Sequence, residues 1–133
     1  MAEHLKTGAS GEDAAAEHLK ARGYEILDRN WTSGRLELDI VARKDGCVVF
    51  VEVKTRSSAR HGLPAQAVGP KKAERLLAAA RLYMSEHDLW DTPCRMDVVA
   101  VIKTAAGYEL EHIQDALGLS DPVAGGHAAW QPW

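Results

Sequence analysis

Hydrophobic and polar positions along this chain change period from helical to extended, then repeat that change. Near the start, alanine and leucine recur every three or four positions until Gly23, which predicts a helix with a glycine stop. The predicted elements, in order, are a helix over 10–22, strands over 24–30, 36–42 and 48–53, a helix over 71–87, and strands over 95–102 and 108–113. This order predicts an α/β fold, a mixed β-sheet flanked by helices.

Two of the predicted strands bring polar groups close to the core. Residues 48–53 are almost continuously β-branched or aromatic, which is typical of a central strand buried on both faces. The strand before it alternates, and the Asp45-Gly46 turn makes the two strands antiparallel neighbours. The alternation is expected to place Leu36, Leu38 and Ile40 on one face and Glu37, Asp39 and Val41 on the other.

The first predicted helix carries an acid on its inward face. Glu12 lies three and four residues before Ala15 and Ala16, on the same side as Leu19. Ser10 is the expected N-cap residue of this helix. A glutamate on an alanine-lined face has to stay in water, find a cation or take up a proton.

Asp39, Glu52 and Lys54 form the candidate chemical centre. Glu52 and Lys54 are two residues apart and project on the same side of their strand, and the hairpin brings Asp39 towards Glu52. Two neighbouring carboxylates need a positive partner. Lys54 could supply it as a simple ion pair. The stronger hypothesis is Mg²⁺ (or Mn²⁺) held by Asp39, Glu52 and the Val53 carbonyl, since Mg²⁺ keeps waters and takes further contacts from phosphates.

A set of short segments carries a family resemblance, and its most specific element is Phe50-Val51-Glu52-Val53-Lys54-Thr55-Arg56. The other matching positions are Gly11-Glu12, Ala14, Leu19, Gly23-Tyr24, Ile26-Leu27, Arg29-Asn30, Glu37-Leu38-Asp39-Ile40-Val41 and Asp97-Val98-Val99. Together they resemble the YraN-like uncharacterised bacterial protein family (uncharacterised protein family 0102). That family is similar to the restriction-endonuclease-like PD-(D/E)XK superfamily, whose signature is an aspartate followed by Asp/Glu-x-Lys.

The resemblance implies a role for each matching residue. Asp39 and Glu52 become metal ligands, Lys54 the catalytic lysine, and Glu12 a further ligand or a water-mediated contact. Glu37 matches the other acid of the family's Glu-x-Asp motif, and Arg56 becomes a candidate phosphate contact. One departure is Leu36, where the family usually has glycine. A larger side chain there alters how closely the backbone can approach a substrate.

Charge is distributed unevenly, although the whole chain carries only −3. From Lys54 to Arg81 there are seven basic residues and one acid, a net +6, whereas residues 86–115 carry a net −5. Lys71, Lys72 and Arg75 are therefore candidate nucleic-acid contacts. The alternative is that they form the solvated side of a helix.

The length of 133 residues suits one domain. We expect a single endonuclease-like domain over residues 1–117 and a C-terminal tail over 118–133, which Trp130 and Trp133 either pin to the body or leave free. Neither a membrane span nor a signal peptide is apparent, so the cytoplasm is the expected location. Cys47 and Cys94 are expected to be free thiols, and the six scattered histidines to lie on the surface or in loops.

Three functional hypotheses follow from these residues. The first is a metal-dependent endonuclease acting on DNA, including branched or irregular structures. The second is a non-catalytic nucleic-acid-binding module of the same fold. The third is a structural protein in which the acids and Lys54 form a buried ion network. A homodimer is a further hypothesis, because cutting both strands usually requires two sites.

Overall fold

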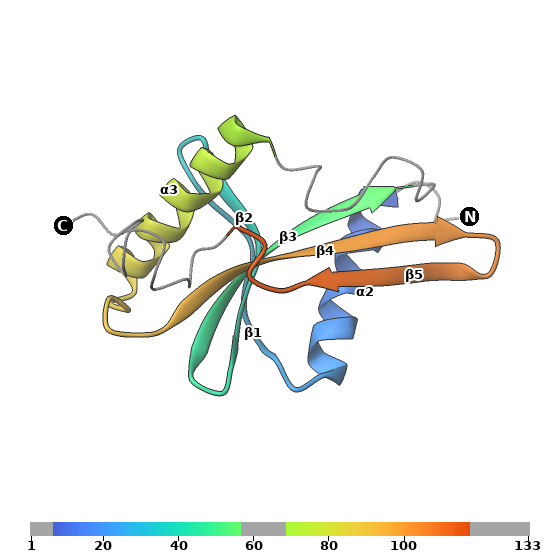
Figure 1. Cartoon of the computed structure of the whole chain (residues 1–133), viewed down its shortest axis with the longest axis horizontal. Helices are drawn as coiled ribbons and strands as arrows, with labels where there is room; N and C mark the ends of the chain where they lie inside the picture. The colour runs from blue at the N-terminus through green and yellow to red at the C-terminus, as the bar shows by residue number, and fades with distance from the viewer. Residues whose placement is uncertain (1–6, 57–68, 118–133) are drawn as a thin grey trace.

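The computed structural model describes residues 7–56 and 69–117, which form one five-stranded sheet and two helices (Figure 1). The elements are α2 (Thr7–Ala21), β1 (Glu25–Ser33), β2 (Leu36–Lys44), β3 (Cys47–Arg56), α3 (Pro70–Glu86), β4 (Cys94–Thr104) and β5 (Gly107–Ile113). The predicted order of elements and the α/β fold class are thus confirmed. The predicted tail, with Trp130 and Trp133, lies outside the described residues, and the division at residue 117 stays a prediction.

The strands lie in the sheet in sequence order, β1-β2-β3-β4-β5. Only the β3–β4 pair is parallel, with Glu52 opposite Val98, and α3 is part of the connection between these two strands. All other neighbouring pairs are antiparallel. The sheet is therefore mixed, as the sequence predicted.

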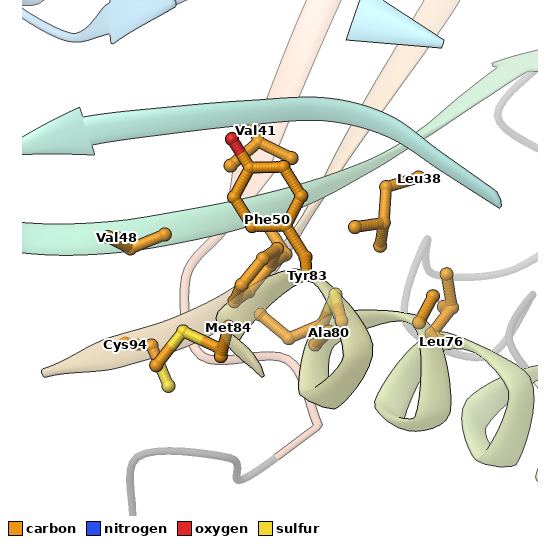
Figure 2. Packing of buried hydrophobic residues seen from close by; sticks show 11 residues of the cluster. Leu38, Val41, Val48, Phe50, Leu76, Ala80, Tyr83, Met84 and Cys94 are labelled. Atoms are coloured by element: carbon orange, nitrogen blue, oxygen red, sulfur yellow. The ribbon is translucent and has the colours of Figure 1, made fainter. Parts of the chain in front are cut away.

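The two helices cover opposite faces of the sheet (Figure 1). On β3, Val48 and Phe50 pack in the core under α3, whereas Val49 and Val51 pack in the core under α2. Strand β3 is thus buried on both sides, as its continuous apolar run predicted. Figure 2 shows the core under α3, where Tyr83 reaches from the helix towards Phe50 and β2.

Local sequence signals explain most of the element boundaries. Helix α2 ends in a Schellman motif, in which the N–H groups of Gly23 and Tyr24 bond to the carbonyls of Lys20 and Leu19 and Gly23 takes φ of 90°. Asp45 and Gly46 both have positive φ, as a two-residue hairpin turn requires.

The predicted start of the first helix is wrong. Helix α2 begins at Thr7, one turn before the predicted N-cap at Ser10. A capping preference is worth only about 1 kcal/mol and does not stop a helix whose preceding residues can also adopt helical dihedrals.

Candidate active site

The site lies where the β2–β3 ladder ends. The last pair of the ladder is Ile40 with Val51, and beyond it the Asp39 Oδ2 accepts a hydrogen bond of 2.8 Å from the backbone N–H of Val53. The carboxylate thus binds a donor on β3 that lies beyond the backbone pairing of the two strands. This bond holds the Asp39 carboxylate in a defined position against β3.

The predicted alternation of β2 is wrong around Asp39. Leu38 and Val41 both pack in the core under α3 although they are three residues apart, whereas Ile40 packs under α2. The strict two-residue period is therefore interrupted between Leu38 and Val41. Asn30, at the facing position of β1 between two ladder pairs, has φ of 53°, so the irregularity extends to the neighbouring strand.

Glu52 is the buried acid of the site, with 4% of its surface exposed. Two lysines approach the same carboxylate oxygen. The Lys54 Nζ lies 3.5 Å from Glu52 Oε2, and the Lys72 Nζ lies 3.4 Å from it. Lys54 comes from the same strand, whereas Lys72 comes from the first turn of α3. The ion pair of Glu52 with Lys54, which the sequence left open as the alternative to a metal, is present.

The sequence assigned Lys72 only to nucleic-acid contact and missed its approach to Glu52. A signal was present, because Lys72 lies four residues before Leu76 and therefore shares the inward face of α3.

The surroundings of Glu52 disfavour its charged form. Burial raises the pKa of Glu52 above its usual range, and the charge of Asp39 and a hydrogen bond between the two side chains raise it further. Lys72 and Lys54 act in the opposite direction without cancelling this effect. The anionic form of Glu52 is therefore held at a net cost in free energy, which a nearby cation would relieve.

Glu12 faces the same region from α2. Burial and the charge of Asp39 raise the pKa of Glu12, while Arg29 and a hydrogen bond with Asn30 lower it. Arg29, 3.9 Å from Glu12, is a partner that the sequence did not predict. Gly11 allows helix and strand to approach closely, because a Cβ there would collide with the Thr55 side chain of β3. The predicted inward position of Glu12 is thus confirmed.

The donor set at this site suits a hard divalent cation. Asp39 and Glu52 supply two adjacent carboxylates, which is the number Mg²⁺ commonly takes from protein. Among residues 7–56 and 69–117, no three histidine, cysteine, aspartate or glutamate side chains form a group that could hold a metal ion. Glu12 as a third ligand beside Asp39 and Glu52 therefore stays a prediction. Val53 takes part through its N–H, and its carbonyl as a ligand stays a prediction.

We expect Glu52→Gln to stabilise the metal-free protein at neutral pH. When folding raises the pKa of an acid, the protonated acid favours the folded state and the ionised acid disfavours it. The folded state therefore loses stability as pH rises through the folded pKa, and a neutral glutamine avoids this loss. Glutamine keeps the size and hydrogen bonding without the charge, for a gain of about 0.5–2 kcal/mol, as is usual for neutralising strained functional groups. Thermal melts in chelator would measure the gain at about pH 7 and its decrease towards about pH 4.

The matched control for this prediction is Glu17→Gln. Glu17 is an exposed residue of α2 whose only described ion pair is with Lys20 on the same helix, and its replacement should leave the melting temperature almost unchanged. A melting temperature of Glu52→Gln below that of the wild type at neutral pH would contradict the argument.

The other predicted contacts surround this centre. Arg56 ends β3, two residues beyond Lys54, and Lys71 is exposed on the first turn of α3. Glu37 is exposed and lines a pocket of about 260 Å³. The other lining residues are Arg35, Lys72, Arg75 and Leu76. The structure thus brings Lys72, Arg75 and Glu37 together at this pocket, and adds Arg35, which the sequence did not single out.

A second polar cluster lies under α2 and was not predicted. Asp97 is fully buried and accepts hydrogen bonds from Arg95, from the Asp115 backbone N–H and from His112 Nε2 at 2.8 Å. His18 Nε2 lies 3.4 Å from the other ring nitrogen of His112. The expectation of surface or loop histidines is therefore wrong for these two, because β5 brings His112 under the C-terminal half of α2.

Two further predictions concern the cysteines and the membrane. Cys47 and Cys94 are free thiols, as expected. Within the two described ranges, no helix is both long and apolar enough to cross a lipid bilayer.

Comparison with known proteins identifies the family. A model of the uncharacterised protein family UPF0102 matches residues 11–101, which include Glu12, Asp39, Glu52 and Lys54. The chain belongs to this family. A UPF0102 protein of Nitratidesulfovibrio vulgaris is 47% identical over 129 residues, covering 96% of this chain and 95% of that protein. The UPF0102 protein BF0634 of Bacteroides fragilis is 45% identical over 116 residues, covering 87% and 95%.

Among solved structures, the chain is similar to Pyrococcus furiosus SfsA in complex with Ca²⁺. The identity is 12% and the TM-score 0.38, and the match covers 84% of this chain and 63% of that one. A similarity at this level carries no argument about function. Membership of UPF0102 confirms the family resemblance drawn from the sequence, whereas the link to the PD-(D/E)XK superfamily stays a prediction and the activity is argued from the site.

Proposed function

We propose that this protein is a metal-dependent nuclease that hydrolyses phosphodiester bonds of DNA. The observation that carries the proposal is the Asp39–Glu52 pair at the end of the hairpin, with Lys54 beside it. The Asp39…Glu52-x-Lys54 spacing, on a mixed sheet with flanking helices, also fits the resemblance to restriction-endonuclease-like proteins.

The residues divide between holding a metal and handling the substrate. Asp39 and Glu52 would hold Mg²⁺ (or Mn²⁺), with Glu12 positioned to bind a water beside it. A bound divalent cation would supply charge neutralisation at the phosphate and a lower pKa for an attacking water. Lys54 would orient that water and stabilise the charge that develops on the phosphate oxygens.

The start of α3 supports binding of the DNA backbone. Lys71 and Lys72 occupy the first turn, which contains no acid. The helix dipole disfavours cations there by about 0.3–1 kcal/mol each. A phosphate bound near this turn would offset that cost, because helix N-termini and lysines both attract anions.

The test is a cleavage assay with single-stranded, flapped, four-way and linear duplex DNA in Mg²⁺ or Mn²⁺. The proposal expects products with the wild type and none with Glu52→Ala, purified in the same way. Cleavage that persists in Glu52→Ala would identify a contaminant, and the proposal would fail if no DNA were cut under any of these conditions.

One observation favours a second candidate, a non-cleaving nucleic-acid-binding module. Lys54 and Lys72 already surround Glu52, so the buried acid has positive partners without a metal. This candidate expects salt-sensitive DNA binding without cleavage, and binding that stays unchanged after neutralising Lys71, Lys72 and Arg75 would count against it. An Mg²⁺-dependent rise in melting temperature that is absent in Asp39→Ala would remove the structural-protein hypothesis. The cytoplasmic location and the homodimer stay predictions.

A further inference from the structure

A pocket that shares Lys72 with the described site is formed between β2 and α3. It lies between the start of β2, with the turn before it, and the first two turns of α3, and its volume is about 260 Å³. A single water needs only about 30 Å³. The pocket is therefore large enough for an organic group rather than for a few ordered waters alone.

The pocket is positively charged. Arg35, Lys72 and Arg75 line it with one acid, Glu37, so the lining carries a net charge of +2. Within residues 7–56 and 69–117, neither arginine forms an ion pair, and Glu37 has none either. All three side chains are exposed, so their charges are accessible to a ligand that brings both a negative group and a hydrogen-bond donor.

Lys72 connects the pocket to the site already described. Its side chain lines the pocket, and its Nζ lies 3.4 Å from Glu52 Oε2. Lys72 therefore borders both the pocket and the carboxylate pair. A ligand that extends from the pocket to Asp39 and Glu52 has to pass this lysine, as a nucleotide next to a phosphodiester held at the two acids would.

A pocket can receive a base only when that base has left the stack. A paired base in a duplex is covered by its neighbours and its partner, and proteins reach it by extrusion or by using single strands. Leu76 supplies an apolar wall, while Glu37 can accept a hydrogen bond from an amino group of a base, as acids do with cytosine N4.

Resting on the nuclease or nucleic-acid-binding function proposed above, we infer that this pocket binds one unpaired nucleotide next to the scissile position. Arg35 and Arg75 hold its phosphate, and Glu37 accepts a hydrogen bond from its base or sugar. The substrate class is then DNA with an unpaired nucleotide at a flap, gap or branch, in preference to continuous duplex.

The experiment measures binding in chelator, so it does not depend on cleavage. The full chain is titrated with fluorescent DNA carrying a single-stranded flap and with a fully paired duplex of equal length. The wild type is expected to bind the flapped DNA more tightly. The Arg35→Gln, Arg75→Gln double variant should lose about 10–100-fold affinity for flapped DNA, because both charge-assisted contacts with the bound phosphate are lost. The preference over duplex should disappear with it.

Two further variants distinguish binding in the pocket from non-specific electrostatic attraction to DNA. Lys71→Gln removes a cation from the same helix turn outside the pocket lining, and it should weaken both DNAs equally by a few fold. Lys103→Gln, on the exposed end of β4, should change neither affinity. Equal losses on both DNAs for the arginine variant, or no loss, would overturn the subsite. Cleavage assays test the proposed nuclease function independently of these binding measurements. If the protein cuts DNA but does not prefer flapped DNA, only the proposed subsite is rejected.

The free nucleotide gives an independent readout. Addition of deoxycytidine 5′-monophosphate should shift amide resonances of Arg35 and Leu76 in the wild type. Inorganic phosphate alone should shift them less, because it cannot reach Glu37 and the arginines together. Equal shifts with phosphate alone would mean that the pocket is a simple anion site, which would also overturn the proposal.

Discussion

Lys54→Met is expected to lower kcat for DNA cleavage by about 10²–10⁴-fold, the range typical of losing a group that moves a proton or stabilises transition-state charge. The physical reason lies in the position of Lys54, whose Nζ is 3.5 Å from the buried Glu52 at the open end of the hairpin. A methionine keeps most of the side-chain length and its packing but cannot donate hydrogen bonds. DNA binding and the response to Mg²⁺ should therefore be largely retained.

Lys72→Met is the matched control, because Lys72 approaches the same oxygen of Glu52 at 3.4 Å. Lys72 comes from α3 and lines the pocket, so its loss should mainly raise KM by weakening substrate contact. Single-turnover kinetics beside steady-state kinetics would separate the two effects. If both variants lost kcat to the same degree, or if Lys54→Met kept it, the assignment of Lys54 as the catalytic lysine would be wrong.

Asp97→Ala is expected to cost about 3–5 kcal/mol, the usual penalty for removing one partner of a buried ion pair. Asp97 is fully buried and holds Arg95, His112 and the Asp115 backbone together. Without it, the Arg95 guanidinium would have to lie near the core with no carboxylate. Since domains of this size are stable by only about 5–15 kcal/mol, the variant would be close to unfolding. Urea denaturation at neutral pH measures the loss, and the exposed Glu109→Ala should stay within about 0.5 kcal/mol of wild type.

The pH dependence of this contribution has a definite sign. Burial acts to raise the pKa of Asp97, but the hydrogen bonds from His112, Arg95 and the Asp115 N–H outweigh it and hold the pKa below its usual value. A depressed pKa contributes stability that is complete above the unfolded pKa, about 3.9, and is lost as pH falls through the folded pKa. The difference between wild type and Asp97→Ala should therefore shrink in acid. A difference in unfolding free energy between wild type and Asp97→Ala that grew below about pH 4 would contradict this pH dependence.

The elements and the centre of the site could be predicted because both depend on local sequence. Hydrophobic period and the Asp45-Gly46 turn define the β2–β3 hairpin, and that hairpin alone brings Asp39, Glu52 and Lys54 together. The likeness to UPF0102 came from the same short segments. Glu12 was found for a related reason, because helical periodicity places it on the inward face of α2.

The parts that were missed depend on contacts between distant segments. Lys72 meets Glu52 only because α3 packs over β2 and β3, and the Asp97 cluster needs α2, β4 and β5 at once. The helical period places Lys72 on the inward face of α3, but no period of two or 3.6 residues specifies which distant residue such a side chain meets. The broken alternation at Asp39 was missed for another reason, since a carboxylate that bonds to a neighbouring backbone N–H changes the strand geometry itself.

The hairpin also has a consequence for the order of folding. Two residues connect β2 to β3, whereas the parallel pairing of β3 with β4 has to bring residue 56 to residue 102 through a long connection. Hairpins form in about 1–10 μs, and loop closure over longer separations is slower and costs more entropy. Asp39 and Glu52 are therefore expected to meet early, before α3 has docked and while Lys72 is still distant. The repulsion between the two carboxylates then disfavours early formation of the β2–β3 hairpin as well as the site of the folded protein.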